Sequence, residues 1–316
     1  MLTRISTAVE KRRMVYMLYY RRKILLALME LFGGRLSAIQ LQKYLFLFTR
    51  EQINKTFSFI PYKYGCFSFQ ANQDMTTLST YGYVVELEKG YELTQKSSNY
   101  LVQLDLFDQQ AMRWVYDEFA RLTQDELLIY VYVNYPFYAI NSTIVSQLLT
   151  PEQMDKVNAQ RRHKFGKQLY TIGYEGVSLE DYIKRLIIED VHILCDVRKN
   201  AYSQKYGFNK SQLEKACDGV GIKYVHVPDL GIESIQRQNL RSQHDYDVLF
   251  AEYDRTVLPA NRNALMYIYS LLHTDERVAL TCFEKDPLQC HRSRVAKALM
   301  DISNNEYTLK NITFNL

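Results

Sequence analysis

Two cysteines, a histidine and three charged residues stand close together near the C-terminal end of the sequence, within residues 278–297. This set comprises Cys282, Glu284, Lys285, Cys290, His291 and Arg292. Core packing does not require such a collection, whereas a thiolate held near cations is a common enzymatic nucleophile. The segment therefore predicts a site for a reactive thiol or for an anion.

The pattern around these residues predicts a strand, a loop and a helix. Residues 278–282 are apolar and rich in strand formers, Asp286-Pro287 breaks the pattern, and apolar residues recur at helical spacing from Ser293. Cys282 is therefore expected at the carboxyl end of a buried strand. Residues 290–292 are expected at or just before a helix start, where free backbone N–H groups favour an anion or thiolate.

Three other interpretations of the thiols were weighed. A cysteine at a strand end is often only a small buried hydrophobe. Cys282, Cys290 and His291 would supply three of four zinc ligands, although no close Cys-x-x-Cys pair is present. A phosphatase-type Cys-x5-Arg loop is excluded, because Ala296 stands where the arginine would be needed. No metal or cofactor is predicted, and zinc stays as the alternative.

Residues 168–316 alternate between strand and helix patterns, which predicts an α/β domain with a mostly parallel sheet. Sites in such sheets form beyond the carboxyl ends of the strands. The residues expected at those ends are Gly173, Tyr174, Asp196, Arg198, His226 and Cys282. We therefore expect one shared pocket at this edge.

Roles follow from side-chain chemistry. Cys282 or Cys290 is the predicted nucleophile, and Glu284, Asp196 or His291 is the predicted proton carrier. The remaining member of the predicted catalytic set is Lys285. The predicted substrate-binding residues are Gly173, Tyr174, Arg198, Asn209, His226 and Arg292. Among them, Arg198 and Arg292 are expected to grip a phosphate or carboxylate. For Asp196 and Arg198 the alternative is a structural ion pair with Lys285 or Glu284.

The half of the chain from Leu169 onward resembles the domain-of-unknown-function 488 family (DUF488). The matching motifs are Thr171-Ile172-Gly173-Tyr174, Asp196-Val197-Arg198, Phe208-Asn209, Tyr224-Val225-His226-Val227-Pro228 with Leu230-Gly231, and Cys282-x-Glu284-Lys285-x-Pro287-x-x-Cys290-His291-Arg292. The resemblance implies an α/β fold and a pocket around these motifs, but no reaction. The chain departs from the family pattern at Ile232, where a second glycine usually follows Gly231.

Residues 1–150 predict a mainly α-helical domain of winged-helix type. Helices are expected over 15–32, from a cap at Ser37, and over 69–81, followed by a hairpin around Lys89-Gly90. Residues 64–68 and the helix after them also resemble Panacea-type antitoxin-like domains. Further helices are expected over 104–150. The tyrosines of 135–138 are interpreted as a packing layer against a neighbouring domain rather than as a surface that stacks on bases.

Nucleic acid is the predicted partner of the N-terminal domain. The residues expected to contact it are Arg12, Arg13, Arg21, Arg22 and Lys23. A solvated helix face explains the same cluster nearly as well. Residues 151–167 are polar and basic, and are interpreted as the linker between the domains.

Composition sets the outer limits. The chain has 316 residues, 47% of them hydrophobic, a net charge of +4 and five cysteines. No apolar run is long enough to span a membrane and no secretory signal pattern is present, so we expect a cytoplasmic protein with reduced thiols. A homodimer is also compatible with the sequence.

Two functions stay open at this point. The first is an enzyme acting on a nucleotide, nucleic acid or other anionic substrate and recruited by the N-terminal domain. The second is a non-enzymatic DNA-binding regulator with a ligand- or redox-sensing C-terminal pocket.

Overall fold

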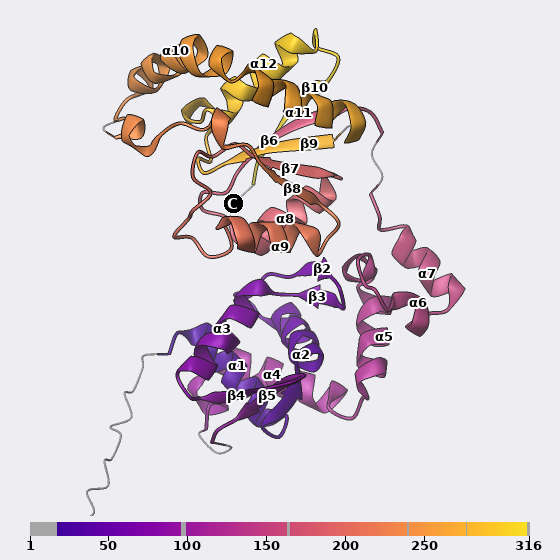
Figure 1. Ribbon diagram of the computed structural model, residues 1–316. Coiled ribbons are helices and arrows are strands. Elements are labelled where there is room, and N and C mark those ends of the chain that lie inside the picture. The colour runs from indigo at the N-terminus through magenta and orange to yellow at the C-terminus, as the bar shows by residue number, and fades with distance from the viewer. Residues whose placement is uncertain (1–17, 96–98, 163–164, 239, 276, 315–316) are drawn as a thin grey trace, which may run out of the picture.

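The computed structural model describes residues 18–95, 99–162, 165–238, 240–275 and 277–314. Figure 1 shows a mainly helical N-terminal part and an α/β C-terminal part, which carries a single large sheet. This division agrees with the fold class predicted from the sequence.

The first part of the chain consists of helices with two small antiparallel sheets, ordered β1-β5-β4 and β2-β3. Its elements are α1 (Tyr20–Leu31), β1 (Arg35–Ser37), α2 (Ala38–Glu51), β2 (Ile60–Tyr62), β3 (Gly65–Phe67), α3 (Phe69–Thr80), β4 (Val84–Leu87), β5 (Gly90–Leu93), α4 (Leu106–Phe119), α5 (Gln124–Asn134), α6 (Val145–Leu148) and α7 (Pro151–Asn158).

Local sequence explains where these helices begin and end. Ser37 caps α2 in a capping box with Gln40, and Gly33 follows α1 with φ at 85°, a conformation that suits glycine. The expected hairpin forms between β4 and β5. Of the predicted helix 15–32, residues 15–17 lie outside the described residues.

The C-terminal part contains a five-stranded sheet in which every neighbouring pair is parallel, in the order β10-β6-β9-β7-β8. Its elements are β6 (Gln168–Gly173), α8 (Leu179–Ile188), β7 (Ile193–Asp196), α9 (Lys210–Asp218), β8 (Lys223–His226), α10 (Gln243–Ala260), α11 (Arg262–Asp275), β9 (Arg277–Cys282), α12 (Arg292–Ile302) and β10 (Thr308–Ile312). The edge strand β10 was not predicted.

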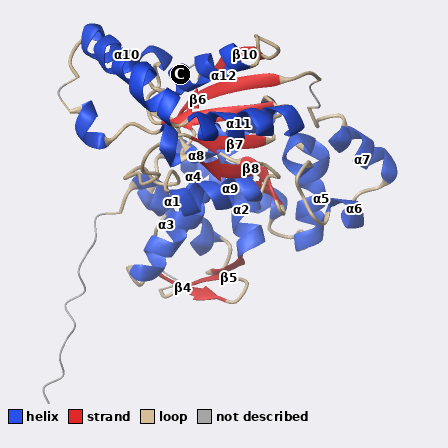
Figure 2. Cartoon of the chain, turned by 45° about the horizontal axis from the view of Figure 1, so that its top comes forward, coloured by secondary structure: helices blue, strands red, loops and turns tan. Residues whose placement is uncertain are grey.

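Helices cover both faces of this sheet, as strands buried on both sides require. One apolar core joins the sheet to α10, α11 and α12, and a second core joins it to α8 and α9. In Figure 1 the two sets of helices lie on opposite sides of the strands, which Figure 2 shows in red from a second direction. β9 lies in the middle of the sheet, so Cys282 ends a central strand.

The N-terminal part packs against the α8 and α9 side of the sheet. Ile60 of β2 belongs to the same apolar core as α8. Glu180, in the first turn of α8, is buried and accepts hydrogen bonds from the Ser68 hydroxyl (3.0 Å) and the Gln70 N–H (2.8 Å) at the start of α3. The carboxylate thus occupies the positive end of α3 and joins the two parts.

Within the predicted linker, Pro151–Asn158 forms helix α7. Thr150 caps this helix in a capping box with Gln153, a signal the sequence contains. The tyrosines pack as expected, but the ring contacts of Tyr135 and Tyr138 are with Phe46 of their own domain rather than with a neighbouring one. Among the described residues, no helix is both long and apolar enough to cross a membrane.

Candidate functional site

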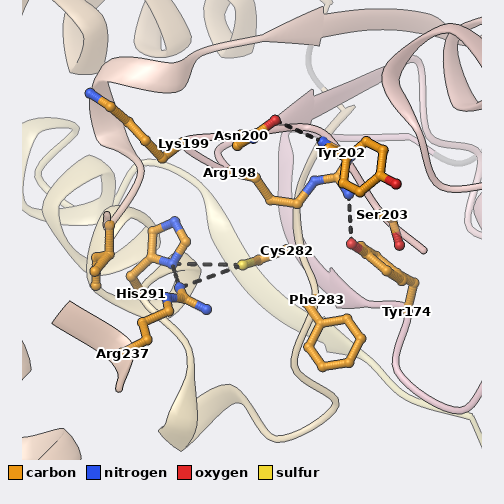
Figure 3. A pocket seen from close by; sticks show the side chains of 11 residues that line it. Tyr174, Arg198, Lys199, Asn200, Tyr202, Ser203, Arg237, Cys282, Phe283 and His291 are labelled. Atoms are coloured by element: carbon orange, nitrogen blue, oxygen red, sulfur yellow. Dashed lines mark hydrogen bonds between the residues drawn. The ribbon is translucent and has the colours of Figure 1, made fainter. Parts of the chain in front are cut away.

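Cys282 lies at the carboxyl end of β9 with its thiol against three polar side chains. Its Sγ is 3.2 Å from Glu284 Oε2, 3.6 Å from His291 Nδ1 and 3.9 Å from Arg237 Nη2. Cys282 is only 1% exposed, yet it lines a cavity of about 210 Å³. Figure 3 shows the thiol with the side chains of His291 and Arg237 on one side of it.

The hydrogen bonds of His291 define its tautomer. Nε2 lies 2.8 Å from the Val197 carbonyl oxygen, which can only accept, so Nε2 carries the proton. Nδ1 lies 2.6 Å from Arg237 Nη2, which can only donate, so Nδ1 presents its lone pair. Arg237, which is bound to Nδ1, is the cation that faces the thiol.

The surroundings of Cys282 favour its thiolate. Burial acts to raise the pKa of the Cys282 thiol, but the hydrogen bond from Cys290 and the charge of Arg237 outweigh it, and the pKa falls well below 9.0. Burial and the neighbouring Cys282 raise the pKa of Cys290 well above 9.0. Cys290 is therefore the thiol donor of the pair, and Cys282 is the sulfur that ionises.

Glu284 completes this proton system. Burial, followed by the charge of Cys282, raises the pKa of the Glu284 carboxyl above its ordinary value of 4.5. Glu284 also forms an ion pair with Arg237 Nη1. The two shifts run in opposite directions, so the pKa values of Cys282 and Glu284 lie closer together than those of the free side chains.

The loop after Cys282 is held from two sides. Gly173 ends β6 so close to this loop that a Cβ there would lie 1.9 Å from the Glu284 carbonyl oxygen. Arg292 is 2% exposed and donates to the carbonyl oxygens of Glu284 (2.5 Å) and Lys285 (3.2 Å). Gly173 is therefore needed for close approach, and Arg292 orders the loop from behind.

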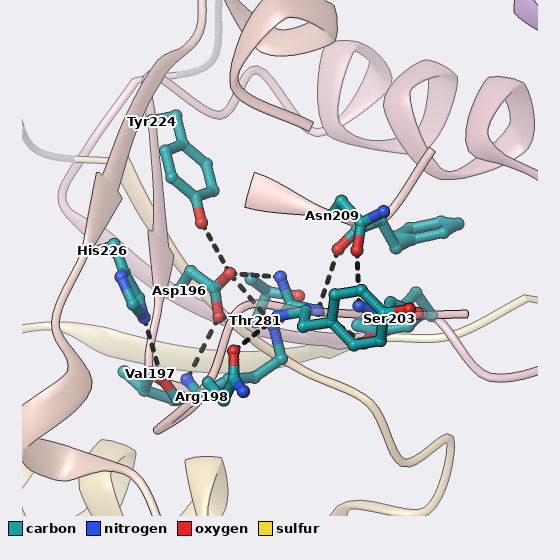
Figure 4. Close-up of polar contacts among 12 residues, drawn as sticks. Asp196, Val197, Arg198, Ser203, Asn209, Tyr224, His226 and Thr281 are labelled. Atoms are coloured by element: carbon teal, nitrogen blue, oxygen red, sulfur yellow. Dashed lines mark hydrogen bonds and ion pairs between the residues drawn. The ribbon is translucent and has the colours of Figure 1, made fainter. Parts of the chain in front are cut away.

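Asp196 and Arg198 pair with each other rather than with the loop (Figure 4). Arg198 Nε lies 2.8 Å from Asp196 Oδ1 and Nη2 lies 2.5 Å from Oδ2, while Nη1 donates to the Tyr174 hydroxyl and the Phe208 carbonyl. Tyr224 also donates to Asp196 Oδ2. Asp196 is fully buried and Arg198 is 6% exposed.

Two sequence-based roles are corrected by this geometry. The predicted pair of arginines gripping one anion is not formed, because Arg292 is outside the cavity lining and Arg198 directs its donors at Asp196, Tyr174 and Phe208. Asp196 is not placed to carry protons for Cys282, since both of its oxygens accept hydrogen bonds from Arg198. The ion-pair alternative is correct for these residues, but their partners are each other.

The remaining predicted residues fall into different places. Tyr174 lines the cavity beside Cys282. His226 Nε2 donates to the Arg198 carbonyl oxygen (2.9 Å), while Asn209 accepts from the Ser203 N–H (2.6 Å), and both line a second cavity. Lys285 is exposed outside both cavities.

A metal ion would find three ligand atoms here. Those of Cys282, Cys290 and His291 lie within 4.8 Å of one another. However, the Arg237 guanidinium contacts His291 Nδ1 and approaches Cys282 Sγ, so a positive group already faces two of the three atoms. The arrangement fits an activated thiol better than a metal centre.

The N-terminal basic residues are also corrected in part. Arg21 and Arg22 both form ion pairs with Asp74, which is fully buried in α3, and Arg22 is itself 9% exposed. These two side chains connect α1 to α3 through Asp74, so their guanidinium groups are already paired and are not available to bind phosphate groups. Lys23 is half-buried, and Arg12 and Arg13 lie outside the described residues.

Arg237 is the site residue that the sequence did not reveal. It lies in a short 3₁₀ helix, Ser234–Arg237, about midway between β8 and α10, with no motif to mark it. Ile232, where the chain departs from the family pattern, is 6% exposed and lines the thiol cavity. The loop after Gly231 therefore contributes directly to the site.

Comparison with known proteins agrees with the motif resemblance. Residues 178–299 match the family model described as Domain of unknown function DUF488. This range runs from α8 into α12 and contains Arg237, Cys282 and His291. No curated protein matches the chain. The resemblance of the C-terminal half to DUF488 is therefore confirmed over residues 178–299.

Proposed function

We propose that the C-terminal domain is a cysteine-dependent hydrolase or transferase acting on an anionic substrate, with Cys282 as nucleophile. The observation that carries the proposal is the position of Cys282 Sγ, which lines a cavity and lies 3.9 Å from the guanidinium of Arg237. A thiol with only a packing role would have its pKa raised by burial, as Cys195 and Cys217 do. Cys282 is shifted in the opposite direction.

The chemistry begins with the Cys282 thiolate and a protonated Glu284. Sγ attacks an electrophilic atom of the substrate, a bond from sulfur to that atom forms, and the leaving group departs with its electron pair. Glu284, whose Oε2 is 3.2 Å from Sγ, gives its proton to the leaving group. Water or an acceptor alcohol then attacks the same atom, gives a proton to Glu284 and releases the thiolate.

Arg237 and His291 are positioning groups in this scheme. Arg237 stabilises the thiolate through its charge, and its donation to Nδ1 holds the imidazole of His291 in place. The other ring nitrogen fixes the backbone at Val197, which begins the segment on the far side of the cavity. Both contacts restrict the motion of the groups around Sγ.

Alkylation by iodoacetamide, followed by peptide mass spectrometry, tests the proposal. We expect Cys282 to react first, at a rate that rises with pH and levels off below pH 9.0, because the thiolate is the reactive form. Cys217, buried on α9, is the internal control within each molecule. If Cys282 reacts no faster than Cys217, the proposed nucleophile is wrong. The sensor hypothesis would then be the better one.

The N-terminal domain is proposed to bring the enzyme to nucleic acid. What supports this is the order of helices and strands from α1 to β5, together with the basic residues of the first segment. Because Arg21 and Arg22 are committed to Asp74, the proposal now depends on Arg12, Arg13 and Lys23.

A further inference from the structure

A second, larger cavity adjoins the one that contains the thiol. It has a volume of about 700 Å³, against about 210 Å³ for the first. The two share Lys199, Asn200 and Tyr202, which follow β7 and separate the cavities. Figure 3 shows these three side chains along one border of the thiol cavity.

The small size of the first cavity implies that a substrate extends beyond it. Pockets that enclose a whole metabolite usually measure about 300–1,000 Å³. A cavity of about 210 Å³ therefore holds only the reacting part. The rest of the substrate needs a neighbouring space that is open to the first.

Two cavities adjoin the thiol site, and their lining distinguishes them. One, of about 220 Å³, lies beyond the Arg237–Glu284 ion pair and is lined by Leu240, Tyr246 and Leu249 among others. The larger one contains Lys199 and Lys210 with a single carboxylate, Glu214. An anionic group is therefore favoured in the larger cavity.

The polar groups of the larger cavity are available to a ligand. In the part of the chain that the structure describes, the Lys210 ammonium has no hydrogen-bond or ion-pair partner. Lys199 has only a loose contact with Glu233 at 3.4 Å, and both side chains are substantially exposed. Such a pair contributes little stability, so Lys199 can turn to a ligand at small cost.

Tyr202 adds an aromatic surface at the junction of the two cavities. Its side chain is 69% exposed, and among the described residues no other ring stacks on it. The Tyr202 N–H donates to Asn200 Oδ1 (3.0 Å), which fixes the turn that presents the ring. Exposed aromatic rings of this kind bind the faces of nucleobases.

We infer that the larger cavity binds a nucleoside monophosphate, with its phosphate at Lys199 and Lys210 and its base against Tyr202, so that the nucleotide reaches Cys282. The inference rests on the proposed function only for the role of Cys282. Lysine ammonium groups bind phosphate as point charges. A ligand held in this way lies across segment 199–202, between the two cavities.

Calorimetric titration with adenosine, guanosine, cytidine and uridine monophosphates, and with the matching nucleosides, tests the inference on the full chain. We expect at least one monophosphate to bind. Its nucleoside should bind about tenfold more weakly, because the loss of one hydrogen bond to a charged group lowers affinity by about that factor. Lys210→Ala and Tyr202→Ala should each weaken binding of the monophosphate about tenfold. Lys215→Ala, on the exposed surface of the same helix, should leave it unchanged.

Cys282→Ser separates this inference from the proposed function. It should bind the monophosphate as the unmodified protein does, because the sulfur is needed for reaction and not for the phosphate. Bound nucleotide should also slow alkylation of Cys282 in the unmodified protein. If no monophosphate binds, or if Lys210→Ala and Tyr202→Ala bind like Lys215→Ala, the inference is wrong even where Cys282 proves reactive.

Discussion

Replacing Arg198 with methionine should destabilise the C-terminal domain severely. The change removes the guanidinium donors from Asp196, which is fully buried, and leaves that carboxylate with the Arg198 N–H and the Tyr224 hydroxyl. Breaking one side of a buried ion pair costs about 3–5 kcal/mol. Because the free energy of unfolding of an ordinary domain is about 5–15 kcal/mol, this loss is a large part of the stability of the domain.

Urea unfolding followed by circular dichroism measures the effect. Arg255→Met is the matched control, since the Arg255–Glu252 pair on α10 is largely exposed and should contribute little to stability. The double variant Asp196→Asn, Arg198→Met should be less destabilised than Arg198→Met alone, because no buried charge is then left unpaired. If Arg198→Met unfolds like Arg255→Met, then the pair is not structural and Arg198 is free to bind a substrate.

Three further predictions follow from the contacts. Arg237→Gln should slow alkylation of Cys282 at neutral pH about tenfold or more, since it removes a cation 3.9 Å from Sγ; an unchanged rate would show that Arg237 does not stabilise the thiolate. Glu180→Ala should lower the free energy of unfolding by about 1–3 kcal/mol in urea titrations, because two donors at the start of α3 lose their acceptor, and a loss no larger than that of an exposed glutamate would contradict this. The double variant Arg12→Ala, Arg13→Ala should weaken binding to duplex DNA and reduce the slope of log K against log salt by roughly 0.9 for each lost phosphate contact. No binding by the unmodified protein at low salt would instead favour a protein-docking role for this domain.

Much of the fold follows from local pattern. The strands ending at Gly173, Asp196 and Cys282 are short apolar runs, and the parallel arrangement that brings their ends together follows from the helices between them. Strand β10 has no such signal. Four of its five residues are exposed, so it lacks the apolar alternation by which edge strands are recognised.

The location of the site could be predicted from the sequence, but the hydrogen bonds and ion pairs of its residues could not. Residue types placed Cys282, Glu284 and His291 together, and the structure brings them within reach of one sulfur. Whether an arginine is free depends on what lies beside it in three dimensions. In the sequence, Arg198 and Arg292 cannot be told apart from anion-binding arginines. In the structure, Arg198 pairs with the buried carboxylate of Asp196, and Arg292 donates to two backbone carbonyl oxygens.

Arg237, by contrast, belongs to the site although no pattern in the sequence marks it. It lies far along the chain from Cys282, in a loop without apolar periodicity or a recognisable motif, and it reaches the site only because α10 to α12 and the sheet fold together. Sequence reasoning had singled out this loop through Ile232, but had assigned it no residue of the site. A contact between segments so distant in sequence has no local signature.

The most direct test of the account is the ionisation of Cys282 itself. The ultraviolet absorbance of thiolate, measured against pH as the difference between the unmodified protein and Cys282→Ser, isolates this one group. Since the pKa of the folded thiol is depressed, the account predicts a difference signal that is already complete at pH 9.0, where an ordinary thiol is half ionised. If the difference appears only at or above pH 9.0, Cys282 is an ordinary buried thiol and the proposed nucleophile does not exist.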